Sequence, residues 1–272
     1  CIESVQGSQI YHNGKKLINF SSNDYLGLAG HHTLTEAAKH AIDRFGVGSG
    51  ASRLVCGSLE VHHELEEALA SWLKAEAALV FSSGFAAAQG VISSIVGSGD
   101  VVVIDKKVHA STVDAVKLSG AKLRVFKHND LSSLEKILKW ADNRNSRVLT
   151  IAESVYSMDG DSPVIEDLVD LKERYGSWLM LDEAHALGCY GESGGGLALK
   201  SNLSEKIEIR LGTLGKSIGV AGGFICGSKK LVDLLVNKAR SFIFSTAPSP
   251  IASAAALAGV KLVQSEEGDA RR

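Results

Sequence analysis

Several residues that are able to do chemistry stand directly after short apolar runs of this sequence. Asp182 and His185 follow one such run, and Lys216 follows another, three residues after Thr213. A buried aspartate is costly unless it meets a cation, such as a protonated ring nitrogen. A lysine whose pKa is lowered forms a Schiff base with a carbonyl group. The residues in such positions are Ser83, Gly84, Asp105, His109, Glu153, Ser157, Asp182, His185, Thr213 and Lys216. The set predicts a site for carbonyl chemistry.

Each of these residues also has an ordinary structural explanation. An aspartate after a strand is most often a turn former or a helix cap. A single histidine is usually structural, and a single lysine is usually solvated. The structural explanation weakens for the set as a whole, because five strand ends each deliver a polar or ionisable group.

A second feature concerns an anion. Residues 82–84 (Ser-Ser-Gly) precede a helical pattern over 85–96. The free N–H groups and the positive dipole end of such a helix suit a phosphate. The same residues also suit a plain serine cap with a turn glycine, so both interpretations stay open at this point.

The elements that must position these residues are read from seven short apolar runs. They lie at 79–81, 101–104, 123–126, 148–151, 178–181, 207–211 and 223–226, and helical patterns lie at 61–73, 85–96, 131–142, 165–175 and 231–241. Near-continuous apolar strands that alternate with helices predict an α/β fold with a mainly parallel seven-stranded sheet covered on both faces. Ligands of such sheets bind at the carboxyl ends of the strands, so the polar residues should converge on one edge.

The N-terminal part of the chain has a different pattern. Residues 9–20 predict a hairpin around Asn13 and Gly14, because Asn-Gly is a strong turn signal. We therefore expect an N-terminal arm over residues 1–45 and a large domain over residues 46–272.

Composition excludes several classes of function. The chain has 29 Lys and Arg against 31 Asp and Glu, a net charge of -2, so no basic surplus favours nucleic acid or a membrane surface. No run approaches the ~18 apolar residues of a membrane span. The four cysteines show no CxxC spacing, which argues against a zinc ribbon and predicts a cytoplasmic location.

One competing motif is set aside. Residues 182–185 (Asp-Glu-Ala-His) also occur in helicase motors, and residues 215–217 (Gly-Lys-Ser) imitate the end of a phosphate-binding loop. That loop requires a glycine five places before Gly215, where this chain has Arg210. The order of the two motifs is also reversed, so a nucleoside triphosphatase is not expected.

The sequence resembles the α-oxoamine synthases, which are fold-type I enzymes dependent on pyridoxal 5′-phosphate (PLP). The matching stretches occur in family order and span nearly the whole chain: 19–28, 48–57, 109–111, 128–130, 157–161, 182–185, 213–216 and 244–246. Ser-Arg-Leu-Val at 52–55 and Met-Asp-Gly-Asp at 158–161 favour the biotin-pathway branch. The resemblance implies the fold-type I architecture around PLP.

The resemblance also implies catalytic roles. Lys216 would hold PLP as a Schiff base, and Asp182 would keep the pyridine nitrogen protonated, so that the ring withdraws electrons. His185 would hydrogen-bond the 3-hydroxyl of the ring. His109 would stack on the ring and face the substrate, and Asn23 would lie near the substrate.

Further residues are implied to hold the cofactor. The backbone N–H groups of Gly84 and Phe85 and the hydroxyl of Thr213 would bind the phosphate. Ser157 would lie beside the cofactor, and Thr246 would reach the phosphate bound by a neighbouring subunit. The active site would then be shared between the two chains of a homodimer, and no metal is expected.

The implied reaction is a decarboxylative condensation of L-alanine with pimeloyl-CoA, or with a pimeloyl carrier thioester, to 8-amino-7-oxononanoate in biotin biosynthesis. One alternative is a sibling enzyme that uses glycine and another acyl-CoA, such as acetyl-CoA or succinyl-CoA. A more distant alternative is a non-catalytic homologue, although such a protein has no chemical need for Lys216.

The chain departs from the family pattern in three places. The small C-terminal domain of the family, with an arginine for the amino-acid carboxylate, is expected beyond Arg272. A basic residue at the extreme N-terminus of the family is also absent from this stretch. Gly195 stands where the family usually has arginine.

Overall fold

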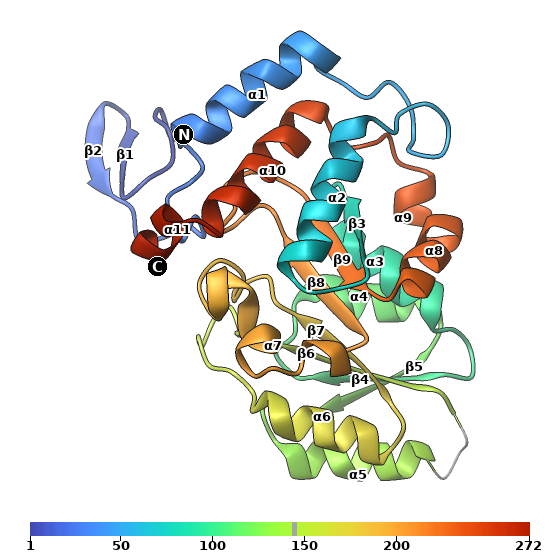
Figure 1. Ribbon diagram of the computed structural model, residues 1–272. Helices are drawn as coiled ribbons and strands as arrows, with labels where there is room; N and C mark the ends of the chain where they lie inside the picture. Colours follow the sequence, from blue (N-terminus) through green and yellow to red (C-terminus); the bar gives the residue numbers. More distant parts are fainter. Residues whose placement is uncertain (143–145) are drawn as a thin grey trace.

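The computed structural model describes residues 1–142 and 146–272. Its centre is a seven-stranded sheet in the order β3-β9-β8-β7-β6-β4-β5 (Figure 1). The strands are β3 (Ala77–Phe81), β4 (Val101–Asp105), β5 (Lys122–Phe126), β6 (Val148–Glu153), β7 (Trp178–Asp182), β8 (Ile209–Thr213) and β9 (Gly223–Gly227). β4 to β8 pair in parallel, whereas β9 runs antiparallel to both β3 and β8. The predicted mainly parallel sheet is confirmed.

Helices cover both faces of this sheet because successive strand residues point to opposite sides. They are α1 (His32–Phe45), α2 (Glu60–Trp72), α3 (Gly84–Ile95), α4 (Ala110–Ser119), α5 (Leu131–Asp142), α6 (Ile165–Arg174), α7 (Gly196–Lys200), α8 (Lys229–Lys238), α9 (Arg240–Ile243), α10 (Pro250–Val263) and α11 (Glu266–Arg271). Two short 3₁₀ turns lie at Glu192–Gly194 and Ser204–Lys206.

Three apolar cores result from this layering. On one face, Val102 and Ile104 of β4 pack with α3, α4, α8 and α9. On the other face, Val101 and Val103 of the same strand pack with α5 and α6. The β3–β9 end of that second face is covered by α1, α2 and α10. Both faces of the sheet are buried, which explains the near-continuous apolar strands.

The N-terminal arm contains more structure than the sequence predicted. The hairpin is present as β1 (Gln9–His12) and β2 (Lys15–Ile18), with Asn13 and Gly14 in the turn at φ of 49° and 69°. The α1 helix follows within residues 1–45 and packs along α10. A division at residue 45 stays a prediction.

Some predicted boundaries were wrong. The strand expected at 207–211 lies at Ile209–Thr213, so Thr213 ends the strand and does not follow it. The helix expected over 231–241 is split at Ala239 into α8 and α9. The polar residues near the end of the chain, Glu266–Arg271, form α11, whose first turn is capped by the Ser265 side chain. Among the described residues, no helix is long and apolar enough to cross a membrane.

Candidate active site

Most of the predicted site residues lie at or just after the carboxyl ends of the strands, and Lys216 lies in the turn between β8 and β9. The Thr213 hydroxyl braces this turn: it donates to the Gly222 carbonyl at 3.0 Å and accepts from the Gly215 amide at 3.2 Å. The Gly219 amide donates to the Lys216 carbonyl at 2.8 Å. Three hydrogen bonds therefore hold the backbone of the turn that carries Lys216.

The Lys216 side chain begins a chain of polar contacts. Its Nζ lies 2.6 Å from Nε2 of His185, and Nδ1 of His185 lies 2.6 Å from the Tyr25 hydroxyl. The Tyr25 hydroxyl donates to Oδ1 of Asn23 at 3.3 Å. When Lys216 donates to Nε2, the neutral imidazole carries its proton on Nδ1 and donates it to Tyr25. Asn23, from the N-terminal arm, is thus joined to the lysine.

The pKa values in this chain of contacts favour neutral nitrogen bases. Burial lowers the pKa of Lys216, against the opposing charges of Asp182 and Glu153. Burial also lowers the pKa of His185, with help from the positive charges of Lys216 and His109, to about 4. A lowered pKa makes the neutral form of Lys216 more accessible than that of an exposed lysine, and the lone pair of that form is what attacks a carbonyl carbon.

Two buried carboxyl groups, those of Glu153 and Asp182, lie side by side, and their charges act on Lys216. Glu153 and Asp182 end the neighbouring strands β6 and β7 and are paired in register. Burial, and then the charge of Asp182, raise the pKa of Glu153 to about 8. Burial also raises the pKa of Asp182, although the Ala184 amide donates to its Oδ1 at 2.9 Å. The nearby positive charge does not bring the pKa of either carboxyl group back to its ordinary value. A cation placed against Asp182 would therefore stabilise its ionised form.

His109 lies beside these acids at the start of α4. Its backbone amide donates to Oε1 of Glu153 at 2.5 Å. Its Nδ1 accepts from the Ser111 amide, so the ring caps α4. The side chain is exposed, and its positive charge acts on both Asp182 and His185. The structure therefore brings Lys216, Asp182, His185 and His109 together.

The predicted phosphate residues form a separate group at the N-terminus of α3. Ser83 caps this helix by accepting from the Ala86 amide at 3.0 Å. A Cβ on Gly84 would lie 3.9 Å from the Thr213 hydroxyl, so the two residues are adjacent. Phe85 is 43% exposed at the same helix end. The helix has twelve residues, and its first N–H groups carry the positive dipole end.

Ser157 and Thr246 are two further predicted site residues, and both are exposed in loops. Ser157 is exposed in the loop after β6, and its backbone amide interacts with Glu153. Thr246 is exposed and forms an isolated β-bridge with Ser52. A cavity of about 310 Å³ is lined by Thr246 together with Ser82 and Gly222 of the same chain. The subunit on which Thr246 acts stays a prediction.

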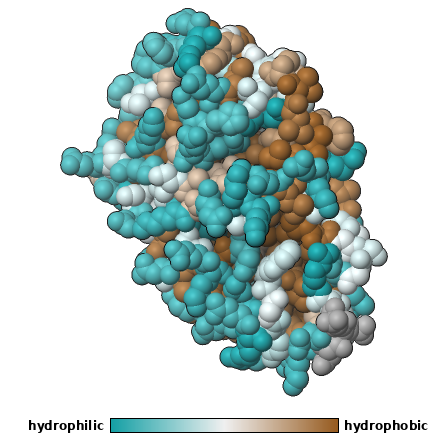
Figure 2. Space-filling view, turned by 45° about the vertical axis from the view of Figure 1, so that its right-hand side comes forward, coloured by the Kyte–Doolittle hydropathy of each residue, from teal (hydrophilic) through white to brown (hydrophobic). Residues whose placement is uncertain are grey.

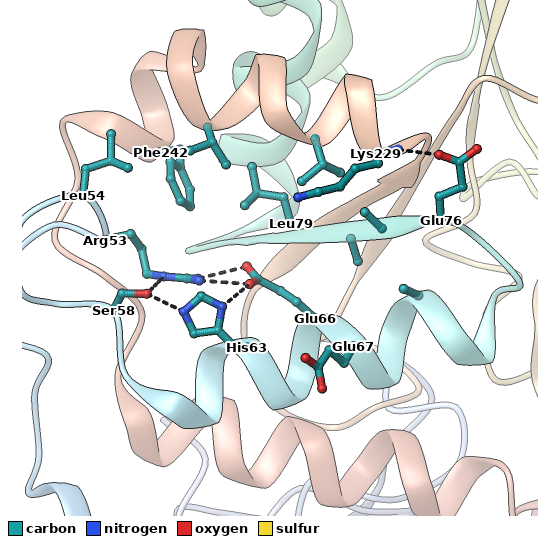
Figure 3. Close-up of a pocket in the computed structure, with 15 residues that line it drawn as sticks. Arg53, Leu54, Ser58, His63, Glu66, Glu67, Glu76, Leu79, Lys229 and Phe242 are labelled. Atoms are coloured by element: carbon teal, nitrogen blue, oxygen red, sulfur yellow. Dashed lines mark hydrogen bonds and ion pairs between the residues drawn. The ribbon is translucent and has the colours of Figure 1, made fainter.

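A cavity of about 430 Å³ lies away from this site, between α2, β3 and α8 (Figure 3). Two of its charged groups are paired with each other, since Nη1 and Nη2 of Arg53 each donate to Glu66 at 2.9 Å. Leu54 and Phe242 line another part of its wall. This cavity is lined by none of the site residues Lys216, Asp182, His185 and His109. The site at the strand ends, and not this cavity, is therefore the candidate active site.

Comparison of the sequence with known proteins shows the family of this chain. The pattern of the family described as aminotransferase class I and II matches residues 15–272. The chain belongs to the aminotransferase class I and II family. Among its relatives in this family, the 8-amino-7-oxononanoate synthase of Geobacter sulfurreducens is 48% identical over 272 residues, covering 100% of this chain and 69% of the relative. The enzyme of the same name from Chromobacterium violaceum is 46% identical over 271 residues, covering 100% and 70%.

Solved structures superpose on more than nine-tenths of this chain. A serine palmitoyltransferase from S. paucimobilis, with a bound PLP–myriocin aldimine, superposes with a TM-score of 0.94 at 29% identity, over 97% of this chain and 67% of that one. An 8-amino-7-oxononanoate synthase from Francisella tularensis superposes with a TM-score of 0.79 at 30% identity, over 91% and 69%. The predicted PLP-dependent aminotransferase fold is confirmed.

Tyr25 was not among the predicted site residues, and Glu153 was predicted only as one of the polar residues that follow apolar runs, without a role of its own. Tyr25 bridges His185 to Asn23, and its only sequence signal is its place within the matching stretch 19–28. Glu153 ends a strand beside Asp182, and its place after the apolar run 148–151 was the available signal. Its contact with the His109 amide depends on a loop from another strand, which no local pattern reveals.

Proposed function

We propose that this chain is a PLP-dependent acyltransferase that condenses L-alanine with a pimeloyl thioester and releases carbon dioxide, giving 8-amino-7-oxononanoate. The single observation that carries the proposal is the contact of Lys216 with His185, together with the buried carboxyl group of Asp182 whose charge acts on Lys216. This is the arrangement that a carbonyl-bearing, cationic ring requires.

The residues fit PLP by their chemistry. Lys216 offers a half-buried amine of lowered pKa, and Asp182 offers a buried carboxyl group that lacks sufficient positive charge. The α3 N-terminus at Gly84 offers N–H groups to a phosphate, with the Thr213 hydroxyl adjacent. When bound, PLP forms a Schiff base with an amine and withdraws electrons from the neighbouring carbon.

We propose that the side chains divide the work by their charge. Asp182 would hold the ring nitrogen of bound PLP in its protonated form, and the neutral His185 imidazole would hydrogen-bond the 3-hydroxyl. His109 and Ser157 would line the space around the ring. Lys216 Nζ accepts the α-proton of alanine as a neutral amine and later returns a proton to the same carbon, because its lowered pKa lets it act near neutral pH.

The substrate assignment is supported by relative similarity. Relatives named 8-amino-7-oxononanoate synthase are 42% to 48% identical to this chain over 96% to 100% of its length. Among the solved structures, the Francisella tularensis enzyme of that name and the serine palmitoyltransferases are equally distant, at 29% to 30% identity, so the assignment rests on the first group. Asn23 lies next to Tyr25 at the open side of the site, where we place the alanine and acyl substrates. The acyl donor is CoA or a carrier protein, since thiol release is the same for both.

The experiment supplies the protein and PLP with four substrate pairs: L-alanine or glycine, each with pimeloyl-CoA or acetyl-CoA. We expect carbon dioxide and an amino ketone of the mass of 8-amino-7-oxononanoate from L-alanine and pimeloyl-CoA alone. Turnover with glycine and acetyl-CoA instead would assign the chain to the sibling enzymes. A PLP-loaded protein inactive with every pair would favour a non-catalytic homologue.

We also propose that the protein works as a homodimer with a shared site. Two segments run together near Thr246: the Ala247 amide donates to the Ala51 carbonyl at 3.0 Å, and Ser52 bridges Thr246. These segments expose large apolar side chains, Val55 at 77% and Phe244 at 71%. On the side of the molecule where α8 and α9 lie, apolar side chains form a band at the surface (Figure 2). A second copy would cover such a surface.

A further inference from the structure

A second group of charged residues lies beside the proposed site and is centred on His128, just after β5. Nδ1 of His128 lies 2.9 Å from Oδ1 of Asp105, and Nε2 lies 2.8 Å from Oδ2 of Asp161. The His128 side chain is 16% exposed, that of Asp105 is fully buried, and that of Asp161 is 43% exposed. One imidazole ring therefore joins a buried carboxylate to one at the surface.

The neighbouring residue repeats these contacts. The Asn129 amide donates to Oδ2 of Asp105 at 2.9 Å, and its side-chain Nδ2 donates to Oδ2 of Asp161 at 2.9 Å. Asn129 holds a φ of 52°, in the left-handed region that asparagine tolerates. Two successive residues thus bind the same pair of carboxylates.

The contacts connect three loops that follow three neighbouring strands. Asp105 ends β4, the strand whose following loop leads to His109. His128 follows β5, and Asp161 belongs to the loop after β6, which also carries Ser157. A salt bridge of 2.8 Å between Lys107 and Asp159 adds a second link between the first and third loops. The wall of the proposed site that holds His109 and Ser157 is thereby assembled.

The ring must carry a proton on both nitrogens to donate to both carboxylates. Burial lowers the pKa of His128, but the hydrogen bonds to Asp105 and Asp161 outweigh it, so the pKa lies above its ordinary value. The pKa of Asp161 lies below its ordinary value because the bonds and charge of His128 outweigh its desolvation. The Tyr156 ring packs edge-on against the His128 ring, with ring centroids 4.5 Å apart and ring planes at 90°.

A divalent cation is the competing explanation of this cluster. One ligand atom each of His128, Asp159 and Asp161 lie within 4.8 Å of one another. Both ring nitrogens already face carboxylates, however, and the Lys107 ammonium occupies the neighbourhood of Asp159 at 2.8 Å. A protonated imidazole and an ammonium already balance the carboxylates, so a metal is treated as an outcome of the test.

We propose that His128 is a positioning residue: as an imidazolium it clamps the loop that carries Ser157 to the end of β4 and so fixes one wall of the active site. The significance for catalysis rests on the proposed function, whereas the clamp itself does not. Protonation of Asp161 as pH falls weakens its bond with His128, and deprotonation of His128 as pH rises leaves one N–H for two carboxylates, so one of the two bonds is lost. The loop is therefore held between these two titrations and loosens outside them. The titratable and charged groups around the ring are Asp105, Lys107, Lys127, Asp130, Tyr156, Asp159 and Asp161.

The test measures amide hydrogen exchange of the loop after β6 without cofactor or substrate. The amides of Tyr156 and Gly160 are bonded within this loop, to the carbonyls of Asp161 and Tyr156. We expect His128→Gln and Asp161→Asn each to lower their protection factors roughly 10- to 100-fold at neutral pH, the effect of losing a hydrogen bond between charged groups. The double variant should lose less than the sum of the two single losses, because both changes remove the same His128–Asp161 bond. His40→Gln, at an exposed histidine of α1, is the matched control and should leave them unchanged.

The pH dependence provides a second readout. In the wild-type protein the protection factors should fall as pH rises through the titration of His128, which is followed by NMR and assigned by the signal that His128→Gln removes. The variant should show no such fall. Asp161→Asn changes a half-exposed side chain, so it keeps the test decisive if His128→Gln folds poorly.

Unchanged protection in both variants, or additive losses in the double variant, would overturn the clamp. Slower exchange of the wild-type loop on adding Zn²⁺ or Mg²⁺, reversed by EDTA, would replace it with a metal site. A wild-type protein that turns over no alanine would overturn the proposed function and leave the exchange result standing.

Discussion

At the scale of single residues, the site combines two nitrogen bases of lowered pKa with two carboxyl groups of raised pKa. Burial is the first cause in all four cases, for Lys216, His185, Glu153 and Asp182. Desolvation disfavours whichever form is charged, so it moves bases down and acids up. Such opposed shifts within one cluster are typical of catalytic sites.

Replacing Lys216 tests the covalent role of its amine. Lys216→Ala should abolish turnover while the fold survives, because the side chain is half-buried in a turn already held by backbone hydrogen bonds. Borohydride reduction of the PLP-loaded wild type, followed by peptide mapping, should label Lys216. Lys39→Ala, at an exposed lysine paired with Glu36, should keep full activity; a label on another lysine contradicts the assignment.

Replacing Asp182 tests the partner of the ring nitrogen. Asp182→Asn keeps the shape but removes the negative charge, so turnover should fall by about 10³-fold or more, since preorganised charges contribute the largest catalytic terms. Asp182→Glu should be less damaging but still poor. Exchange of the alanine α-proton, followed by NMR in D₂O, measures the step directly, and near-normal exchange in Asp182→Asn contradicts the role.

Replacing Glu153 tests the raised pKa of the buried pair. The folded pKa of about 8 lies above the ordinary 4.5, so the folded state binds this proton more tightly, and stability falls as pH rises from about 4.5 to about 8. Glu153→Gln stays neutral, and its free energy of unfolding should decline less over this interval. Urea unfolding at pH 5 and pH 8.5 without cofactor measures the difference; equal slopes in the two proteins mean that Glu153 titrates normally.

At the scale of elements, the site depends on how closely β9 approaches the first turn of α3. A Cβ on Gly223 would lie 2.4 Å from the Gly84 amide nitrogen and 2.5 Å from its Cα. Both neighbours are backbone atoms, so no side chain is able to move aside. Only glycine permits this contact, which sets the position of the proposed phosphate site.

Gly223→Ala should therefore displace the N-terminus of α3 and weaken PLP binding by roughly tenfold or more, because overpacking against backbone costs on the order of 1–3 kcal/mol. Gly97→Ala is the matched control, since its Cβ would meet only an ordinary contact at 3.9 Å. Equilibrium titration with PLP gives both dissociation constants. Equal values for Gly223→Ala and the wild type contradict the close approach.

At the scale of the whole molecule, the proposed shared site is tested by mixing subunits. Thr246→Val removes one hydroxyl from the phosphate site and should weaken PLP binding roughly 10- to 100-fold, the effect of one hydrogen bond to a charged group. Lys216→Ala subunits are inactive. If Thr246 serves the other subunit, each mixed dimer holds one site with both groups intact.

Mixing the two variants should then restore high-affinity PLP sites and part of the activity. Each variant incubated alone is the control. An absence of recovery in the mixture, or an active species that sediments as a monomer, contradicts the shared site.

The sequence alone determined the layers of this protein and predicted the main residues of its candidate site. Apolar strand runs and helical periods are local patterns, so the seven strands and the hairpin turn at Asn13 and Gly14 were predictable. Lys216, Asp182 and His185 follow strands, and the carboxyl ends of parallel strands meet at one edge of a sheet.

Only the tertiary structure decided which of those groups touch and which neighbours change their charge. Tyr25 reaches His185 across 160 positions of sequence, and Glu153 meets the His109 amide across 44. The His128 clamp likewise joins loops from three strands. Side-chain contacts and burial depend on which strands lie next to one another, and the order β8-β7-β6-β4-β5 is fixed by packing over the whole sheet and not by any local pattern.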